Sequence, residues 1–420
     1  MTNLKNILFI VVDCLRADYI YEPNKSQIPN ITKLKNNGFS FLNTIATTTT
    51  TSPSFSSLLT GLYPFENGVR SHSGYALKKD VITFPEILQK HGYHTYAEVT
   101  GPFVKELGLT KGFEEFNYRD RKQTIFSNWG KTLLKKFKTH YESPWFTFLH
   151  IWSLHEPRMV LNEFNKKEYG NSNYPRAIAS IDKYLGELFK VIEVDDTIII
   201  LTGDHGEQTY RSFIEKNIKK IIYKIIKKIK KHQLFKISFA KMVRPFHTGH
   251  GFSIYDILVK VPLIFYNKEL VPTNHSTTQI RQIDIFPTIL DLIKIKTNNK
   301  VTGKSTLPII EQKDYKHRDA YLEAVGRAIP NKEEWLAGIR IANKFKYIYS
   351  PFRKKYKDEL YYLEKDPFER INLAQIYPNF AEKFKERINN LKFKKFVGER
   401  LKKEEQQKVL ERLRALGYVD

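Results

Sequence analysis

Residues 47–61 (TTTTTSPSFSSLLTG) combine hydroxyl side chains with the signals of a helix start. Residues 52–54 are predicted to form the first turn of a short helix ending near Gly61, because the missing N–H of Pro53 costs nothing there. Thr51 then lies at or just before the helix N-terminus, where backbone N–H groups and the helix dipole stabilise an anion. Its hydroxyl is a candidate nucleophile. Taken alone, the stretch favours a simpler interpretation, in which Thr51 or Ser52 only caps the helix.

Three further side chains with metal-binding chemistry follow predicted strands. Asp13 ends the apolar run 6–13 (NILFIVVD), and Asp204 and His205 come directly after the run 196–202 (DTIIILT). Open α/β sheets place their ligands at the carboxyl ends of such strands. With the Thr51 hydroxyl, two carboxylates and one imidazole form a ligand set for a divalent metal: Ca, Mg or Mn, or, with further histidines, Zn or Mn. A metal there would lower the pKa of the threonine hydroxyl and polarise an ester oxygen.

Histidines and one arginine supply the remaining candidates. His155 and His250 are predicted to bind a second metal or to protonate the leaving oxygen, and His150 is a further candidate for these roles. Arg16 and His247 are predicted to contact the substrate. The alternative for each histidine taken singly is a structural role. The joint pattern favours chemistry, because the charged residues cluster directly after apolar strands.

These residues need a sheet to position them, and the chain alternates apolar strands with helices. This alternation predicts an α/β fold with a doubly wound, mostly parallel sheet flanked by helices. A smaller α+β unit should follow, which divides the chain into residues 1–314 and 315–420. The predicted strands are 6–13, 94–99, 145–152, 196–202 and 261–266, with shorter ones in 334–350 and 358–363; the predicted helices are 30–37, 81–90, 175–192, 277–293 (interrupted at Pro287), 378–393 and 402–416.

The composition of the chain limits the kinds of partner that we expect. The chain has 420 residues, a formal net charge of +24 and one cysteine, Cys14, so it has no internal disulfide. No signal peptide is visible at the start, and a cytoplasmic location is expected. Within a basic insert at 211–245, residues 212–241 place isoleucines at helical spacing among lysines. Such a helix can lie on an anionic membrane or an acidic glycan, or its isoleucines can simply cover the core. We expect no nucleic-acid partner, because no aromatic platform or recognition motif is present.

The motifs together resemble those of the sulfatase and alkaline-phosphatase superfamily. The family's nucleophile motif is similar to residues 51–61, and its metal-binding Asp-His-Gly-Glu turn is similar to residues 204–207. The resemblance covers nearly the whole chain in order and implies the fold and the metal site. The further matching residues are Asp13, Arg16, Asp18, Tyr63, Pro64, Gly68, His250, Gly251, Tyr255, residues 261–264, Asp284, Pro287, Thr288, Leu360, Tyr361, Asp366, Pro367, Glu369, Asn372, Leu373, residues 411–413 and residues 416–418.

Departures from the family pattern decide the expected chemistry. A sulfatase needs a Cys or Ser that is oxidised to formylglycine, whereas the same oxidation of Thr51 would give a ketone, so no formylglycine is expected. Phe55 replaces the family's arginine, Thr100 and Gly101 stand near the place of its lysine, and Cys14 stands where many sulfatases have a second Asp ligand. Ser153 stands where many relatives have Asp. The resemblance then points to the threonine-nucleophile branch, which includes phosphodiesterases, phosphonate-ester hydrolases and phospho-group transferases.

The sequence therefore predicts a metal-dependent hydrolase or phospho-group transferase acting on an anionic ester: a phosphodiester, phosphonate or phosphomonoester. Thr51 would be the nucleophile and the fourth ligand of a metal held by Asp13, Asp204 and His205. One alternative is a sulfuric ester hydrolase (sulfatase). An alternative of another class is a non-catalytic pseudoenzyme that binds membranes or glycans through its basic helix.

Overall fold

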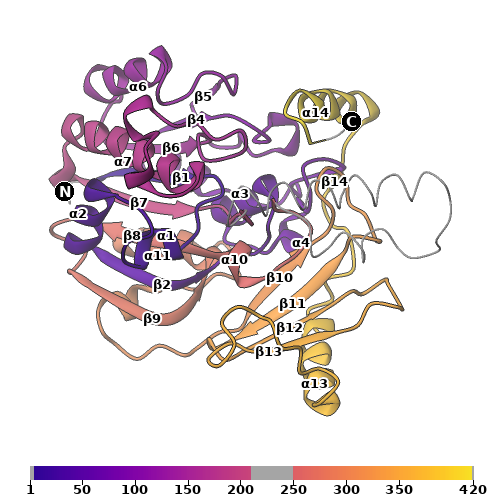
Figure 1. Ribbon diagram of the computed structural model, residues 1–420. Coiled ribbons are helices and arrows are strands. Elements are labelled where there is room, and N and C mark those ends of the chain that lie inside the picture. Colours follow the sequence, from indigo (N-terminus) through magenta and orange to yellow (C-terminus); the bar gives the residue numbers. More distant parts are fainter. Residues whose placement is uncertain (1–3, 210–248, 419–420) are drawn as a thin grey trace.

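The apolar run at the start of the chain forms strand β1 (Asn6–Val12) in the middle of an eight-stranded sheet. The computed structural model describes residues 4–209 and 249–418 (Figure 1). All seven contacts between neighbouring strands are defined by their pairing: β4–β5, β4–β6, β1–β6, β1–β7 and β2–β9 are parallel, and β8 runs antiparallel to both of its neighbours, β7 and β2. The predicted doubly wound, mostly parallel α/β sheet is confirmed. In spatial order the strands are β5 (Glu115–Tyr118), β4 (His94–Val99), β6 (Trp145–Ile151), β1, β7 (Thr197–Gly203), β8 (Lys260–Tyr266), β2 (Phe39–Ile45) and β9 (Asn274–Arg281).

Helices cover both faces of this sheet, which explains why β1 has no polar alternation. Ile7, Phe9 and Val11 point into one apolar core and Leu8 and Ile10 into the other, as the two-residue period of a strand requires. The helices of the main body are α1 (Asp18–Tyr21), α2 (Pro29–Asn37), α3 (Thr51–Thr60), α4 (Pro64–Asn67), α5 (Phe84–Lys90), α6 (Asn128–Thr139), α7 (Asn173–Val191), α10 (Asp256–Val259), α11 (Ile285–Leu292) and α12 (Leu307–Ile310).

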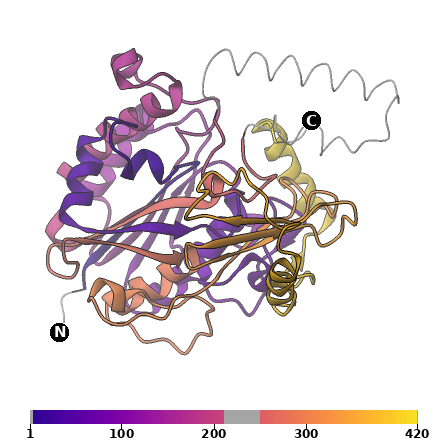
Figure 2. The same ribbon diagram turned by 60° about the horizontal axis from the view of Figure 1, so that its bottom comes forward.

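A smaller antiparallel sheet follows, as predicted for the C-terminal part. It contains β10 (Ala320–Ala324), β11 (Leu336–Ile341), β12 (Phe345–Tyr349) and β13 (Glu359–Tyr362). Helix α13 (Pro378–Asn389) packs on one face through Phe384 and Ile388, while the other face packs against Ile45 and Ile254 of the main body. Figure 2 shows this orange sheet standing beside the large one.

The end of the chain returns to the main body. Strand β14 (Glu399–Arg400) pairs with β3 (Tyr75–Ala76), and helix α14 (Lys403–Ala415) places Val409 and Leu413 in the same core as β1. Figure 1 shows α14, in yellow, above the smaller sheet and beside β14. The return brings the final described residues close to residues from the first half of the chain. The predicted boundary at residues 314 and 315 stays a prediction.

Some predicted elements are wrong. Residues 277–293 are not one helix: the strand β9 runs to Arg281, and α11 begins only at Ile285. Pro287 lies in the first turn of α11, where it needs no bend. The polar but β-branched Thr277 and Thr278 suit β9, an edge strand. The short strands predicted within 334–350 are present, as the hairpin of β11 and β12, which turns at Ala342 and Asn343 with φ values of 45° and 60°.

The predicted helix 81–90 begins later, at Phe84, because Thr83 accepts a hydrogen bond from the Glu86 backbone N–H and caps the helix. The basic segment 212–241 and His247 lie outside the described residues. Within the described ranges, no helix has the length and apolarity to cross a membrane.

Candidate active site

The predicted metal ligands meet at the carboxyl edge of the central sheet. Strands β1 and β7 run parallel with Val12 beside Gly203, so Asp13 and Asp204 leave the sheet side by side. Strand β6 pairs with β1 on the other side, Ile151 beside Val12, and leads into His155. All of these side chains are buried, at 6% relative exposure or less. The edge rule of parallel sheets places them together, as the sequence predicted.

Helix α3 delivers Thr51 to the same point. Thr51 is the first residue of the helix and is fully buried; its Oγ1 lies 3.3 Å from Asp13 Oδ2 and 3.4 Å from His205 Nε2. The residue at the N-cap position is Thr50, whose side chain makes no capping hydrogen bond. Ser52 donates to the carbonyl of Pro102, 2.6 Å away. The interpretation of Thr51 or Ser52 as a simple cap is therefore wrong: the Thr51 hydroxyl faces the acid and imidazole groups.

Ser54 of the same helix and Gln282, which follows β9, hold the turn at Asp204 in place. Ser54 Oγ donates to the carbonyl of Asp204 at 2.8 Å, and Gln282 Nε2 donates to that carbonyl at 3.0 Å. The side chain of Asp204 is fixed through Oδ1, which accepts from the backbone N–H groups of Cys14 (3.0 Å) and His205 (2.8 Å). These bonds link α3, β1 and the turn after β7 into one rigid group.

The remaining acceptor atoms fit a cation. His205 Nδ1 donates to the carbonyl of Gly206 at 2.9 Å, so its Nε2 presents a lone pair to Asp204 Oδ2, 3.3 Å away. In the neutral form of that ring two acceptors face each other, and Asp204 Oδ2 has no hydrogen-bond partner among the described residues. Asp13 and Asp204, both fully buried, add negative charge. Buried carboxylates of this kind are neutralised by a bound metal, which supports the predicted divalent cation.

The close packing of these charged groups also shifts their pKa values. Burial disfavours the charge of Asp13, but the contact with His150 and the nearby imidazoles of His155 and His205 hold the pKa of Asp13 below its usual range. Burial and the charge of Asp13 raise the pKa of Asp204. Although burial opposes protonation of His205, the carboxylates of Asp204 and Asp13 raise the pKa of its imidazole. One acid is thus favoured in its charged form and the other disfavoured, as expected for two acids that share a site.

His155 and His250 lie beside this group. Their ring centroids are 5.2 Å apart, and the His205 ring is 4.3 Å from that of His250. Burial and the nearby His205 lower the pKa of His250 to about 4, and burial lowers that of His155, so both rings are neutral near pH 7. The structure therefore brings both predicted catalytic histidines to the site.

His150 also contacts the site, through Asp13. Its Nε2 lies 3.3 Å from Asp13 Oδ2, and its Nδ1 lies 3.1 Å from the carbonyl of Thr100. Phe55, at the position of the family's arginine, packs edge-on against the His150 ring at 4.7 Å and against Phe148 at 5.5 Å. An aromatic wall therefore lies beside Thr51.

The two predicted substrate-binding residues have different outcomes. Arg16 is mostly buried and pairs with Asp18 through two hydrogen bonds of 2.9 and 2.7 Å, and it also reaches the carbonyl of Glu207 at 3.4 Å. It therefore borders the site while its charge is already paired, and a substrate contact stays a prediction. His247 lies outside the described residues.

Three further residues at the site had no predicted role. Glu207 Oε2 lies 3.3 Å from His250 Nδ1, and the hydroxyl of Tyr418 lies 3.1 Å from His155 Nε2. The guanidinium of Arg327 lies over the Tyr418 ring, 4.6 Å from its centroid. The family motifs at residues 204–207 and 416–418 marked Glu207 and Tyr418 without showing what they contact. Arg327 carried no signal in the sequence.

The arrangement of a parallel sheet, a buried hydroxyl at a helix start and an acid–imidazole cation site defines the alkaline-phosphatase-like class of proteins. Solved structures agree on the fold: phosphonate monoester hydrolase of Agrobacterium radiobacter aligns with a TM-score of 0.71 and 18% identity, covering 92% of this chain and 95% of its own. A 2-O GAG sulfatase aligns with a TM-score of 0.69 and 16% identity, covering 92% of each chain.

The chain belongs to the sulfatase family. The model of the family described as Sulfatase matches residues 5–295, and that described as N-sulphoglucosamine sulphohydrolase, C-terminal, matches residues 251–394. The ulvan-active sulfatase of Formosa agariphila is 22% identical over 425 aligned residues, which cover 88% of this chain and 76% of that protein. The predictions of the superfamily and of an enzyme of this class are confirmed.

Proposed function

We propose that this chain is a metal-dependent hydrolase or phospho-group transferase of anionic phosphorus esters, with Thr51 as its nucleophile. The supporting observation is the placement of the Thr51 hydroxyl at the start of α3, 3.3 Å from Asp13 Oδ2 and 3.4 Å from His205 Nε2. An alcohol held at a helix start between an acid and an imidazole is arranged for attack on an anionic ester.

Different residues of the chain carry out different parts of the reaction. Asp13, Asp204, His205 and Thr51 would hold a divalent cation, which supplies a lower pKa to the bound alcohol and charge stabilisation to the ester. Thr51 Oγ1 gives up its proton to solvent and attacks phosphorus, the bond to the leaving oxygen breaks, and a phospho-threonine forms. The leaving oxygen departs on the side of His155 and His250, whose rings are neutral near pH 7, and takes its proton from water there. Water, or an acceptor alcohol in a transferase, then attacks phosphorus and restores the Thr51 hydroxyl.

The residues around Thr51 support an ester of phosphorus rather than of sulfur as the substrate. Thr51 carries a methyl group on Cβ, so it cannot become the aldehyde hydrate that formylglycine provides. Phe55, fully buried against Phe103 and Phe148, leaves no arginine at the position that supports formylglycine in the family. A threonine attacking a sulfate ester directly would leave a sulfated threonine that is hard to hydrolyse.

A second candidate is sulfate-ester hydrolysis. It is favoured by the match to the sulfatase family over residues 5–295 and by relatives such as the ulvan-active sulfatase. This candidate predicts that aryl sulfate is the preferred substrate and that turnover does not depend on a covalent phosphorus adduct.

Two variants at one position test the proposal. Thr51→Ala should lower kcat/KM for phosphodiesters and phosphonate monoesters by at least about 10³-fold, because the nucleophile is lost. Thr51→Ser keeps a hydroxyl at the same point and should retain measurable activity. Both are assayed with a phosphodiester, a phosphomonoester, a phosphonate monoester and an aryl sulfate. Wild-type activity in Thr51→Ala would remove Thr51 from the mechanism, and a dominant aryl-sulfate activity would favour the second candidate.

A further inference from the structure

An arginine next to the smaller sheet reaches the site without a carboxylate partner. Arg327 follows β10, and its guanidinium lies 4.6 Å from the centre of the Tyr418 ring and 5.7 Å from that of Phe252. Its Nε is buried and has no hydrogen-bond partner within residues 4–209 and 249–418, and no carboxylate of these ranges forms an ion pair with it. Other arginines of the chain do pair with a carboxylate: Arg16, Arg70, Arg281 and Arg340. The charge of Arg327 is thus available to an anionic ligand.

The side chain of Arg327 packs beside the start of α3. Gly251 has a φ of 88°, and a Cβ there would lie 3.2 Å from Arg327 Cγ and 3.1 Å from Thr50 Cγ2. Glycine at this position therefore allows the arginine to lie close to the residue that precedes Thr51. The backbone is fixed too, because the N–H of His72 donates to the Arg327 carbonyl at 3.3 Å. The fold thus holds a positive charge near the proposed nucleophile.

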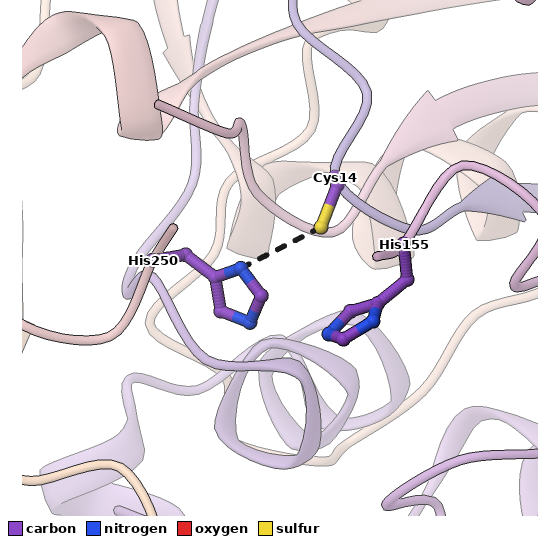
Figure 3. A group of neighbouring side chains, drawn as sticks. All are labelled: Cys14, His155 and His250. Atoms are coloured by element: carbon purple, nitrogen blue, oxygen red, sulfur yellow. Dashed lines mark hydrogen bonds between the residues drawn. The ribbon is translucent and has the colours of Figure 1, made fainter. Parts of the chain in front are cut away.

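Arg327 lies on the side of the site where the leaving oxygen departs in the proposed reaction. Figure 3 shows the rings of His155 and His250 turned toward a common space. Arg327 is next to both histidines, since it packs against Gly251, the neighbour of His250, and lies over Tyr418, whose hydroxyl is 3.1 Å from His155 Nε2. An alcohol that leaves on this side therefore meets a guanidinium.

A second buried group beside Arg327 also lacks a partner. His72 is fully buried, and its ring lies 4.8 Å from that of Tyr418. Ser52 Oγ gives its hydrogen to the Pro102 carbonyl, so His72 Nδ1 donates to Ser52 Oγ at 2.8 Å and the lone pair lies on Nε2. This Nε2 has no hydrogen-bond partner among the described residues. Burial and the charge of Arg327 hold the pKa of His72 well below its usual range, so Nε2 stays an acceptor.

We propose that Arg327 and His72 form a subsite for the leaving alcohol, and that this alcohol carries an anionic group, carboxylate or phosphate, with a hydroxyl near it. The planar guanidinium binds the anionic group through paired N–H donors, and His72 Nε2 accepts a hydrogen bond from the hydroxyl. The chain after β10 then supplies substrate recognition, while the large sheet supplies the proposed metal ligands. The inference rests on the proposed function for the side on which the alcohol leaves, but it is tested by binding and needs no turnover.

Binding to the full-length Thr51→Ala protein with Mn²⁺ present tests the subsite. Calorimetry gives the Kd of four methylphosphonate monoesters: phenyl, 3-carboxyphenyl, 3-phosphonophenyl and 3-carboxy-5-hydroxyphenyl. We expect an acidic group to tighten binding about 10- to 100-fold over the phenyl ester, as for a charge-assisted hydrogen bond. The hydroxyl should tighten it a further ~3- to 10-fold, as for a neutral hydrogen bond. The two acids show whether carboxylate or phosphate is preferred.

Three substitutions, each added to Thr51→Ala, separate the contributions. Arg327→Gln should abolish the preference for an acidic group and leave the affinity for the phenyl ester unchanged. His72→Phe should abolish only the gain from the hydroxyl. The matched control is Arg400→Gln on the exposed strand β14, which removes the same charge elsewhere and should change neither preference.

Equal affinity of the Thr51→Ala protein for the phenyl and both acidic esters would overturn the proposal. An acidic preference that survives Arg327→Gln, or that is lost in Arg400→Gln, would overturn it too, and a hydroxyl gain that survives His72→Phe would remove His72 from the subsite. If Arg327→Gln does not give the parent's circular dichroism spectrum, Arg327→Met, which keeps an apolar stem against Gly251, takes its place with the same expectation. Turnover is assayed separately, so an active Thr51→Ala protein would contradict the proposed function and leave the binding result standing.

Discussion

Phe55 shows how one side chain shapes the surroundings of Thr51. It is fully buried, and its ring contacts Phe103 at 5.1 Å, Phe148 at 5.5 Å and His150 at 4.7 Å. The position that the sequence analysis compares with the family's arginine is therefore part of an apolar wall. This wall also fixes one side of His150, which in turn contacts Asp13.

Restoring the arginine should destabilise the protein. Phe55→Arg would bury a guanidinium against aromatic rings, and we expect the free energy of unfolding to fall by about 3–5 kcal/mol, as for an unpaired buried charge. Phe55→Leu, which keeps an apolar side chain, should cost less, about 1–2 kcal/mol. Urea unfolding followed by circular dichroism measures both. Wild-type stability in Phe55→Arg would show that the site already holds an anion that pairs with arginine.

A buried ion pair joins two elements that are far apart in the sequence. Arg70 donates through Nε to Glu323 Oε1 at 2.9 Å and through Nη1 to the carbonyl of Phe393 at 2.6 Å, and its guanidinium lies 4.2 Å from the centre of the Trp335 ring. Both charges are fully buried. The pair ties the segment after α4 to β10 and to the chain after α13, and so fixes the smaller sheet to the main body.

Breaking this pair should cost far more than breaking an exposed one. Glu323→Gln removes the charge opposite Arg70, and we expect a loss of about 3–5 kcal/mol in the free energy of unfolding, because the guanidinium stays buried without a counter-charge. The matched control is Glu311→Gln, whose pair with Lys313 is 42% and 67% exposed and should cost less than about 1 kcal/mol. Equal costs for the two variants would contradict this account.

The sequence predicted the elements that rest on strong patterns and missed those set by distant partners. The apolar runs that form β1, β6 and β7 could be predicted, because strands covered on both faces need continuous apolar residues. Strand β9 did not, since its outer half is polar and it is defined by pairing with β2.

The site residues show the same difference between what local patterns predict and what distant contacts set. Asp13, Asp204 and His205 follow strands and could be predicted from the edge rule. The contact of Tyr418 with His155 could not, because it depends on the return of α14 across 263 residues of sequence. The geometry of Cys14 was equally hidden, since nothing in a sequence reports a φ of 62°.

The whole molecule carries a formal charge of +24, and this positive charge should attract it to anionic surfaces. We predict that it binds anionic vesicles, and that deleting residues 214–231, which contain eight lysines and one glutamate, lowers the bound fraction. Sedimentation with vesicles containing anionic lipid measures this, with neutral vesicles and high salt as controls. An unchanged bound fraction after the deletion would exclude a membrane role for that segment. The predicted cytoplasmic location stays a prediction.

The central claim is that a cation and the Thr51 alcohol act together on phosphorus at the edge of the sheet. The most direct test is a crystal structure of the metal-loaded protein with orthovanadate, which adopts the five-coordinate geometry of phosphoryl transfer. We predict vanadium bonded to Thr51 Oγ1, with the cation held by Asp13, Asp204 and His205. Vanadate bound away from Thr51, or a cation held by other side chains, would contradict the account.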